Sequence, residues 1–269
     1  MCFSAAPCNI GDGSLESASE RFGVVRSIAG NIDALRDVDQ KFKEMGGDRR
    51  YSLGQVVGLY PWVNECVALL REENCLAMAH YVDREVVTAG HFIGNTTARL
   101  VESVTYAMKS LSSAGYEYFE AMSIEAVFDG VAFLSINEFR THSLYDNERV
   151  KEAFAAWPHK VVFHTSYLER RIICEDLTTG DLDELHHLRQ GVRVQITPGG
   201  IGSVSGGSIN KRRPVAVVYD SDEETVEFVK AEFDLESIIS RMPSDHPASP
   251  EFLRGWEYEC WRADPATHW

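Results

Sequence analysis

The sequence predicts an α/β fold in one domain, built on two sheets, and three observations lead to this prediction. Expected strands and helices alternate over the first third of the chain, which is typical of a sheet covered by helices. Two hairpins follow, turning at Asp129-Gly130 and at residues 221–224, and they indicate a second sheet packed on the first. The chain has 269 residues, of which 44% are hydrophobic and 25% charged, so it is large enough to bury a sizeable core.

Apolar spacing and turn residues predict the elements of the first half. Leu35, Val38 and Phe42 recur at helical spacing and predict a helix over 32–45, after a turn at Gly30 and Asn31. The other expected elements are a strand at 22–28, a strand and loop at 51–58, a short strand at 75–78, and helices at 63–72, 96–112 and 116–122.

The second half is richer in strands, and both ends of the chain look different from the body. The expected elements are a hairpin over 124–134, a helix at 150–156, strands at 160–163, 169–177 and 192–196, a hairpin formed by 214–220 and 225–229, and a helix at 235–241. We expect residues 21–242 to form the domain and residues 1–20, which are small and polar, to be an extension. Residues 243–269 are expected to be a tail that packs on the domain or serves an interface through Trp256, Trp261 and Trp269.

Composition narrows the classes of function. The net charge of −15 argues against a surface that binds nucleic acid in general or anionic membranes. No apolar run approaches the ~20 residues that span a bilayer. The first residues have no basic region and no long apolar run, so we expect no signal peptide and a cytoplasmic protein. Cys66, Cys75 and Cys174 lie in apolar surroundings and are expected to be reduced core residues.

One stretch carries a resemblance to a known family. Residues 53–66 read LGQVVGLYPWVNEC and resemble the LGDxVGxGPxPNEC segment of calcineurin-like metallophosphoesterases, in particular their small bacterial and archaeal phosphodiesterases. Residues 31–35, 145–148, 161–163 and 197–203 also match, so the resemblance runs from about residue 22 to 241. It implies an α/β/β/α sandwich of two mixed sheets flanked by helices. It also implies two divalent metals that clamp a phosphate and activate a water.

In that family, Asp, Asn and His ligands from five loops hold the metals, and most of them are replaced in this chain. Aligned with the family's site are Ser27, Ala29, Gln55, Tyr81, Asp83, Ser135, His164 and Ser166. By this alignment His164 alone remains as a ligand, and Asp83 remains as the residue that orients the lost general acid. Gln55 stands where an Asp bridges the two metals, and a neutral amide does not supply that charge.

These replacements favour a catalytically inactive protein that keeps the scaffold as a binding or regulatory module without a cofactor. The alternative is a phosphoesterase with a rebuilt site that uses no metal or a single Mn, Fe or Zn ion, with His80, Asp83 and His164 as candidate ligands. His186 and His187 are adjacent, would point to opposite faces of a strand, and are not expected to share a metal. The expected partner is a protein, a small molecule or a second copy of the chain.

One basic feature stands out in this acidic chain. A glycine-rich stretch at 199–207 precedes three cationic residues, and backbone N–H groups beside guanidinium groups suit an anion. The candidate anion-binding residues are Gly199, Gly200, Lys211, Arg212 and Arg213. The alternative is a turn with a solvated rim. We expect this loop to border a cleft at the lost metal site, with residues 1–20 covering part of that cleft.

Overall fold

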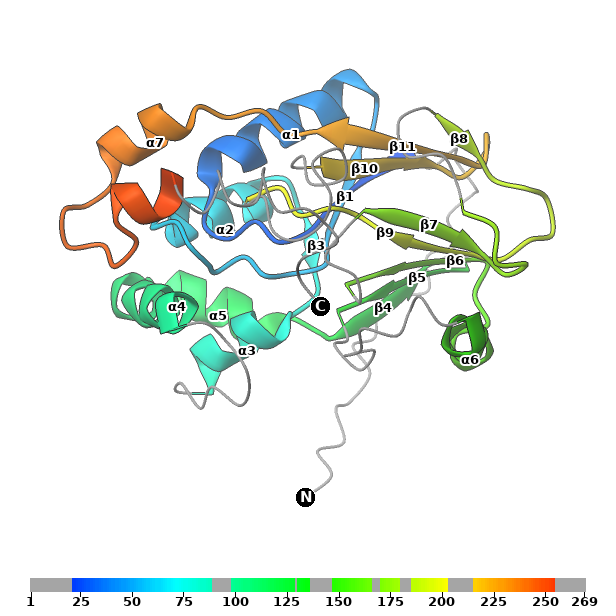
Figure 1. The fold of residues 1–269 in the computed structure, drawn as a ribbon, viewed down its shortest axis with the longest axis horizontal. Coiled ribbons are helices and arrows are strands. Elements are labelled where there is room, and N and C mark those ends of the chain that lie inside the picture. The colour runs from blue at the N-terminus through cyan, green and yellow to red at the C-terminus, as the bar shows by residue number, and fades with distance from the viewer. Residues whose placement is uncertain are drawn as a thin grey trace.

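The computed structural model describes residues 21–88, 98–128, 130–135, 147–165, 170–179, 185–202 and 215–254. Two mixed sheets stack on each other (Figure 1), with strand orders β3-β2-β1-β10-β11-β8 and β4-β5-β6-β9-β7. The strands of the first sheet are Arg21–Val25 (β1), Arg49–Ser52 (β2), Leu76–Ala77 (β3), His186–His187 (β8), Val215–Asp220 (β10) and Thr225–Lys230 (β11). The strands of the second are Glu125–Phe128 (β4), Val131–Leu134 (β5), Val161–His164 (β6), Arg171–Cys174 (β7) and Val194–Thr197 (β9).

Helices flank the two sheets (Figure 1). They are Ile32–Glu44 (α1), Val63–Glu72 (α2), Tyr81–Val87 (α3), Ala98–Ser110 (α4), Ser113–Ala121 (α5), Asn147–Ala156 (α6) and Leu235–Arg241 (α7). The apolar faces of α1 and α2 pack on the first sheet, and α6 packs on the second (Figure 1). The predicted α/β/β/α sandwich is therefore confirmed. Within the described ranges, no helix combines the length and the apolar character that crossing a membrane requires.

Aromatic rings fill the space between the two sheets. The ring of Tyr51 on β2 stacks on Phe133 of β5 with their centroids 4.1 Å apart, and Phe133 stacks on Phe163 of β6 at 5.4 Å. Phe22 of β1 packs among them and contacts Tyr51 edge-on at 5.0 Å. Such ring pairs contribute about 0.5–1.5 kcal/mol beyond the burial of apolar area. This cluster fixes β1, β2, β5 and β6 relative to one another.

A glycine in β1 lets α1 lie directly against the first sheet. A Cβ atom placed on Gly23 would lie 2.3 Å from Cδ2 of Phe42, well inside contact distance. Phe22 and Val24 on either side of Gly23 point toward the second sheet, as strand alternation requires. The bare face of β1 at Gly23 thus receives the Phe42 ring of α1.

The structure differs from the expected elements at several places. The strand expected at 22–28 ends at Val25, because Ser27 and Ala29 have φ angles of 50° and 55° and cannot continue an extended chain. The helix α3 was not expected, because the family alignment treated residues 80–83 as a ligand loop. A capping box explains it: His80 caps the first turn, and the Asp83 side chain accepts the His80 N–H. The short strand β8 was also missed.

The described part of the tail packs on the domain. Ala248 and Leu253 are buried in one apolar cluster with Ala29, Tyr60 and Ile238 of α7. His246 packs edge-on against Tyr106 of α4, with ring centroids 4.7 Å apart. The three tryptophans Trp256, Trp261 and Trp269 lie outside the described residues, so the role predicted for them stays a prediction.

Candidate functional site

The loops that follow β1, β2 and β5 meet at one end of the two sheets. Ser27 follows β1 and Gln55 follows β2, and the Ser27 hydroxyl donates a hydrogen bond of 2.7 Å to Gln55 Oε1. From the second sheet, Ser135 follows β5 and donates through its hydroxyl to the carbonyl oxygen of Leu53 at 2.8 Å. The structure therefore joins two of the predicted site residues, Ser27 and Gln55, by a neutral hydrogen bond, and ties a third, Ser135, to the backbone just after β2.

The first two loops also interlock through their backbones. Ser27 N–H donates to the carbonyl oxygen of Gly54, and Ala29 N–H donates to that of Gln55, both at 2.9 Å. Ser27, Ala29 and Gln55 have φ angles of 50°, 55° and 57°, which are uncommon for residues other than glycine. Such conformations cost about 1–3 kcal/mol each and persist only where the surroundings enforce them. The surrounding structure thus enforces the backbone at these three positions.

Asp83 is a buried carboxylate that organises this junction. Its Oδ2 accepts the N–H of Gln55 at 2.5 Å and that of His80 at 3.1 Å. Its Oδ1 accepts the N–H of Val56 at 2.8 Å and that of Val57 at 3.2 Å. Burial raises the pKa of Asp83 to about 6, and the four N–H donors act in the opposite direction. Both oxygens are occupied by backbone groups, so Asp83 ties the loop after β2 to the start of α3.

His80 and His164 are buried and uncharged at neutral pH. Burial, reinforced by the positive charge of Arg26, lowers the pKa of each imidazole to about 3. The His80 ring lies against the ring of Tyr81, with centroids 4.3 Å apart. His164 Nε2 lies 3.4 Å from the hydroxyl oxygen of Thr197 on the neighbouring strand β9. Both imidazoles therefore have protein neighbours on the described chain.

Sequence reasoning missed Arg26, the residue directly after β1. Its side chain is buried, with 4% of the residue exposed, and its Nη1 donates to the carbonyl oxygen of Pro198 at 3.4 Å. Burial lowers the pKa of Arg26 to about 10, which leaves the guanidinium charged at neutral pH. A fixed cation that acts on both His80 and His164 opposes the binding of a further cation there. The sequence carries no signal for this burial, because arginine is mostly exposed and one directly after an apolar strand is expected at the surface.

The donors present do not fit the two-metal centre that the resemblance implies. Among the described residues, no group of three His, Cys, Asp or Glu side chains is placed to hold a metal ion. Ser27 and Gln55 bond to each other, and Asp83 bonds to backbone N–H groups. Two divalent cations side by side require anionic oxygen ligands that bridge or flank them. The described side chains at this end do not offer such a set.

The other predicted site residues lie elsewhere or outside the described ranges. Ala29 belongs to the apolar cluster with Tyr60 and Ile238, so its side chain does not join the polar junction. Tyr81 is half-buried beside His80. Gly199 and Gly200 are described, and the carbonyl oxygen of Gly200 accepts the N–H of Val215 at 3.2 Å. Outside the described residues lie Ser166, Lys211, Arg212, Arg213 and the segment 1–20, so the predictions for the anion site and for the covering segment stay predictions.

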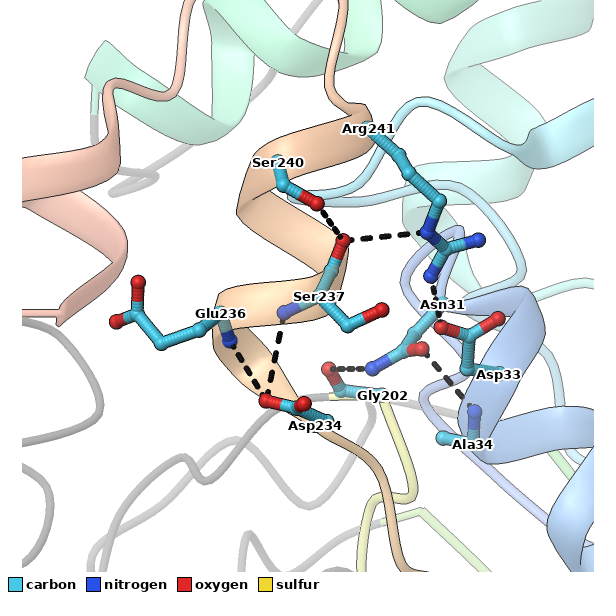
Figure 2. Close-up of polar contacts among 9 residues, drawn as sticks. All are labelled: Asn31, Asp33, Ala34, Gly202, Asp234, Glu236, Ser237, Ser240 and Arg241. Carbon is cyan, nitrogen blue, oxygen red and sulfur yellow. Dashed lines mark hydrogen bonds and ion pairs between the residues drawn. The ribbon is translucent and has the colours of Figure 1, made fainter.

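Two segments that carry the resemblance meet directly beside this junction, where the Gly202 N–H donates to the carbonyl oxygen of Ser27 at 2.8 Å. Figure 2 shows the contacts between them. Asn31 caps α1 by accepting the N–H of Ala34 at 3.1 Å, and its Nδ2 donates to the carbonyl oxygen of Gly202 at 3.4 Å. On the same side, Arg241 of α7 forms an ion pair with Asp33 in the first turn of α1. These contacts hold α1, the loop after β9 and α7 together, so these matching segments serve the fold.

Solved structures of other proteins share this arrangement. The metallophosphoesterase from Sphaerobacter thermophilus superposes with a TM-score of 0.68 at 18% identity, over 89% of this chain and 100% of that one. The hypothetical protein PH1004 from Pyrococcus horikoshii OT3 gives a TM-score of 0.58 at 19% identity, over 84% and 96% of the two chains. No family model and no curated protein matches the sequence. The two stacked mixed sheets are flanked by helices, as in these structures. This chain therefore has the calcineurin-like metallophosphoesterase fold.

Proposed function

We propose that this protein is a catalytically inactive, metallophosphoesterase-like protein that serves as a binding or regulatory module. The observation that carries the proposal is the hydrogen bond from Ser27 to Gln55. These two positions align with metal ligands of the family, and here two neutral side chains use their polar atoms on each other. Hydrolysis in this fold depends on metal ions that activate water and neutralise the phosphate. A serine and an amide in contact do not supply that chemistry.

Asp83 supports the same proposal. A carboxylate that coordinates a metal offers an oxygen lone pair to it, and the Asp83 oxygens accept four backbone N–H groups instead. The candidate set of His80, Asp83 and His164 therefore lacks an open anionic ligand. A single divalent metal would have to bind two neutral imidazoles beside the Arg26 guanidinium, which is electrostatically unfavourable.

The strained backbone at this end supports a role in binding. The interlocked loops after β1 and β2 keep strained φ angles at Ser27, Ala29 and Gln55. Strain of this kind clusters at sites where a protein holds groups ready for a ligand. A scaffold that had lost every role at this end would be free to relax these positions, for example by replacement with glycine.

Elemental analysis combined with a turnover assay tests the proposal. The full chain is dialysed against a chelator, reloaded with Mn²⁺, Fe²⁺ or Zn²⁺ and dialysed again, and a metal-loaded phosphoesterase is carried through the same steps. We expect far less than one metal ion per chain and no hydrolysis of an aryl phosphate with added manganese. Retention of one or two ions per chain, or metal-dependent turnover, would overturn the proposal and favour a phosphoesterase with a rebuilt site.

A further inference from the structure

We infer that residues 243–254, the described part of the tail, form an acid-sensitive clasp that holds the loops after β1 and β2 in place. The residue that anchors this clasp is His246. The inference rests on the proposed function, because it names how a regulatory module would be controlled at this site. The clasp lies beyond the segments that carry the resemblance, which end at about residue 241.

Apolar side chains connect the clasp to the loop after β1. Ala248 and Leu253 of the clasp are buried in one cluster with Ala29, Tyr60 and Ile238 of α7. The end of the clasp, drawn in red in Figure 1, accordingly lies beside α7. Ala29 is one of the positions aligned with the family's metal site, so the clasp packs against the back of the candidate site.

Ala29 is bonded through both of its backbone groups to the loop after β2. Its N–H donates to the carbonyl oxygen of Gln55 at 2.9 Å, and its own carbonyl oxygen accepts the N–H of Tyr60 at 2.9 Å. The next residue, Gly30, donates to the carbonyl oxygen of Val56 at 2.7 Å. The φ of 55° at Ala29 persists only where the surroundings enforce it. The clasp is part of those surroundings, so its release would loosen both loops.

His246 anchors the clasp on α4. The residue is 8% exposed, and its ring packs edge-on against Tyr106 of α4 with centroids 4.7 Å apart. Its Nδ1 accepts the N–H of Ala248 at 3.2 Å, and its own backbone N–H donates to the carbonyl oxygen of Pro243 at 3.0 Å. These bonds shape the turn that brings Ala248 into the apolar cluster.

The neutral form of His246 fits this place, and the charged form does not. Because Nδ1 accepts a hydrogen bond, the ring hydrogen is on Nε2. Nε2 is buried and makes no hydrogen bond within the described residues. A second proton would go to Nδ1, where it would meet the Ala248 N–H and break that bond. The resulting buried charge would also lack an acceptor for Nε2, which is unfavourable.

The sign of the pH dependence follows from the groups beside His246. In the described chain these are the Asp245 carboxylate on the clasp and the Tyr106 phenol on α4, whose hydroxyl donates to Asp245 Oδ1 at 3.4 Å. Burial lowers the pKa of His246, and the charge of Asp245 acts in the opposite direction. The stability that the neutral imidazole gives the closed clasp is complete above the ordinary pKa of 6.5 and is lost as pH falls below it. The clasp therefore opens in acid.

The test measures hydrogen exchange of backbone amides in the full chain, with each rate divided by its intrinsic rate at that pH. The N–H groups of Ala29, Gly30 and Tyr60 report on the loops, and those of Val217 and Val218 in the central strand β10 report on global unfolding. From pH 7.5 to 5, we expect the protection of the three loop amides to fall about tenfold more than that of the two strand amides. An equal fall at all five would overturn the inference.

Matched variants assign the acid effect to one histidine. His246→Asn keeps an oxygen that can accept the Ala248 N–H but does not titrate, so the additional loss of protection at the loop amides should disappear. His187→Asn makes the same change at an exposed histidine of β8 and should keep that loss. If His246→Asn behaved like the wild type, the acid effect would belong to His80 and His164, and the inference would be wrong.

A second variant tests the apolar contacts if His246→Asn does not fold. Leu253→Ala removes a clasp side chain from the cluster, and at pH 7.5 the protection of the Ala29 and Gly30 amides should fall severalfold more than that of Val217. Leu185→Ala, at an exposed leucine, should leave these amides unchanged. Loop amides that exchange in Leu253→Ala as they do in the wild type would show that the clasp does not hold the loops.

The inference and the proposed function fail separately. Amide exchange measures the opening of the loops and needs neither a metal nor a ligand. A uniform fall in protection would remove the clasp and keep an inactive binding module. Metal bound in stoichiometric amounts, or metal-dependent turnover, would overturn inactivity, and the exchange result alone would still decide whether the clasp exists.

Discussion

Ser135 donates its hydroxyl hydrogen to the carbonyl oxygen of Leu53 at 2.8 Å and so joins the loops of the two sheets. Both residues are buried, at 4% and 0% exposure. Ser135→Ala would leave the Leu53 carbonyl group without this partner, and we expect a loss of about 1–3 kcal/mol in the free energy of unfolding. Urea denaturation measures the loss. Ser244→Ala, at an exposed serine, should change stability by less than about 0.5 kcal/mol, and equal effects would contradict this account.

Asp83→Asn should lower the free energy of unfolding by more than Ser135→Ala does. The amide NH₂ group cannot accept the hydrogen bonds from the N–H donors that one carboxylate oxygen now accepts. At least two backbone N–H groups would lose their acceptor inside the protein, at about 1–3 kcal/mol each. Denaturant titration followed by circular dichroism gives the change in stability. Asp222→Asn, at an exposed aspartate, is the matched control. A mild effect at Asp83 would mean that its hydrogen bonds do not organise the junction.

Acid should destabilise the protein through His80 and His164. Their folded pKa values of about 3 lie below the ordinary 6.5, so between these pH values the unfolded chain binds more protons. The stability contributed by the neutral imidazoles is complete above pH 6.5 and is lost as pH falls toward 3. Asp83, raised from 3.8 to about 6, opposes this loss between those values but binds only one proton. We therefore expect stability to fall by about 3 kcal/mol between pH 6.5 and 4.

Denaturation curves at several pH values measure this dependence. His164→Gln should flatten it, because one of the two shifted imidazoles is removed. His187→Gln, at an exposed histidine of β8, should leave it unchanged. A wild-type stability that is constant from pH 6.5 to 4 would show that the two histidines are not buried in their neutral form.

Gly54→Ala should be far more costly than Gly191→Ala, although both residues have positive φ angles, of 82° and 74°. A Cβ atom on Gly54 would lie 2.4 Å from the carbonyl oxygen of Met78, whereas nothing lies within 4 Å of one on Gly191. The left-handed backbone alone costs alanine about 1–2 kcal/mol, so the difference between the variants isolates the clash. Thermal unfolding compares the two variants. Similar melting temperatures would contradict the close approach of Gly54 to the carbonyl oxygen of Met78.

Local patterns predicted much of the fold. The helix α7 has the predicted bounds, and the final hairpin of β10 and β11 agrees within a residue at each end, because periodicity and turn residues act over short distances. The helix α3 escaped prediction because its start depends on a capping histidine, His80, within a segment aligned as a ligand loop. The strand β8 has only two residues, too few for a pattern.

The site was predictable only in part. The family alignment pointed to Ser27 and Gln55, and the structure places them in contact. The alignment could not show that the Asp83 carboxylate binds backbone N–H groups 26–28 residues away, because that depends on how distant loops pack. Nor does a sequence tell whether an arginine at the end of a strand is buried, and Arg26 was missed for that reason.

The Asp83 carboxylate and the interlocked loops hold this end of the molecule with the chain's own atoms. Proteins that rely on a bound metal for folding are limited by the supply of that element, and chelators denature them. We expect this chain to reach its folded form equally well in a cell starved of manganese, iron or zinc. The amount of the protein in the cell would then depend on its synthesis and degradation and would not change with the supply of these metals.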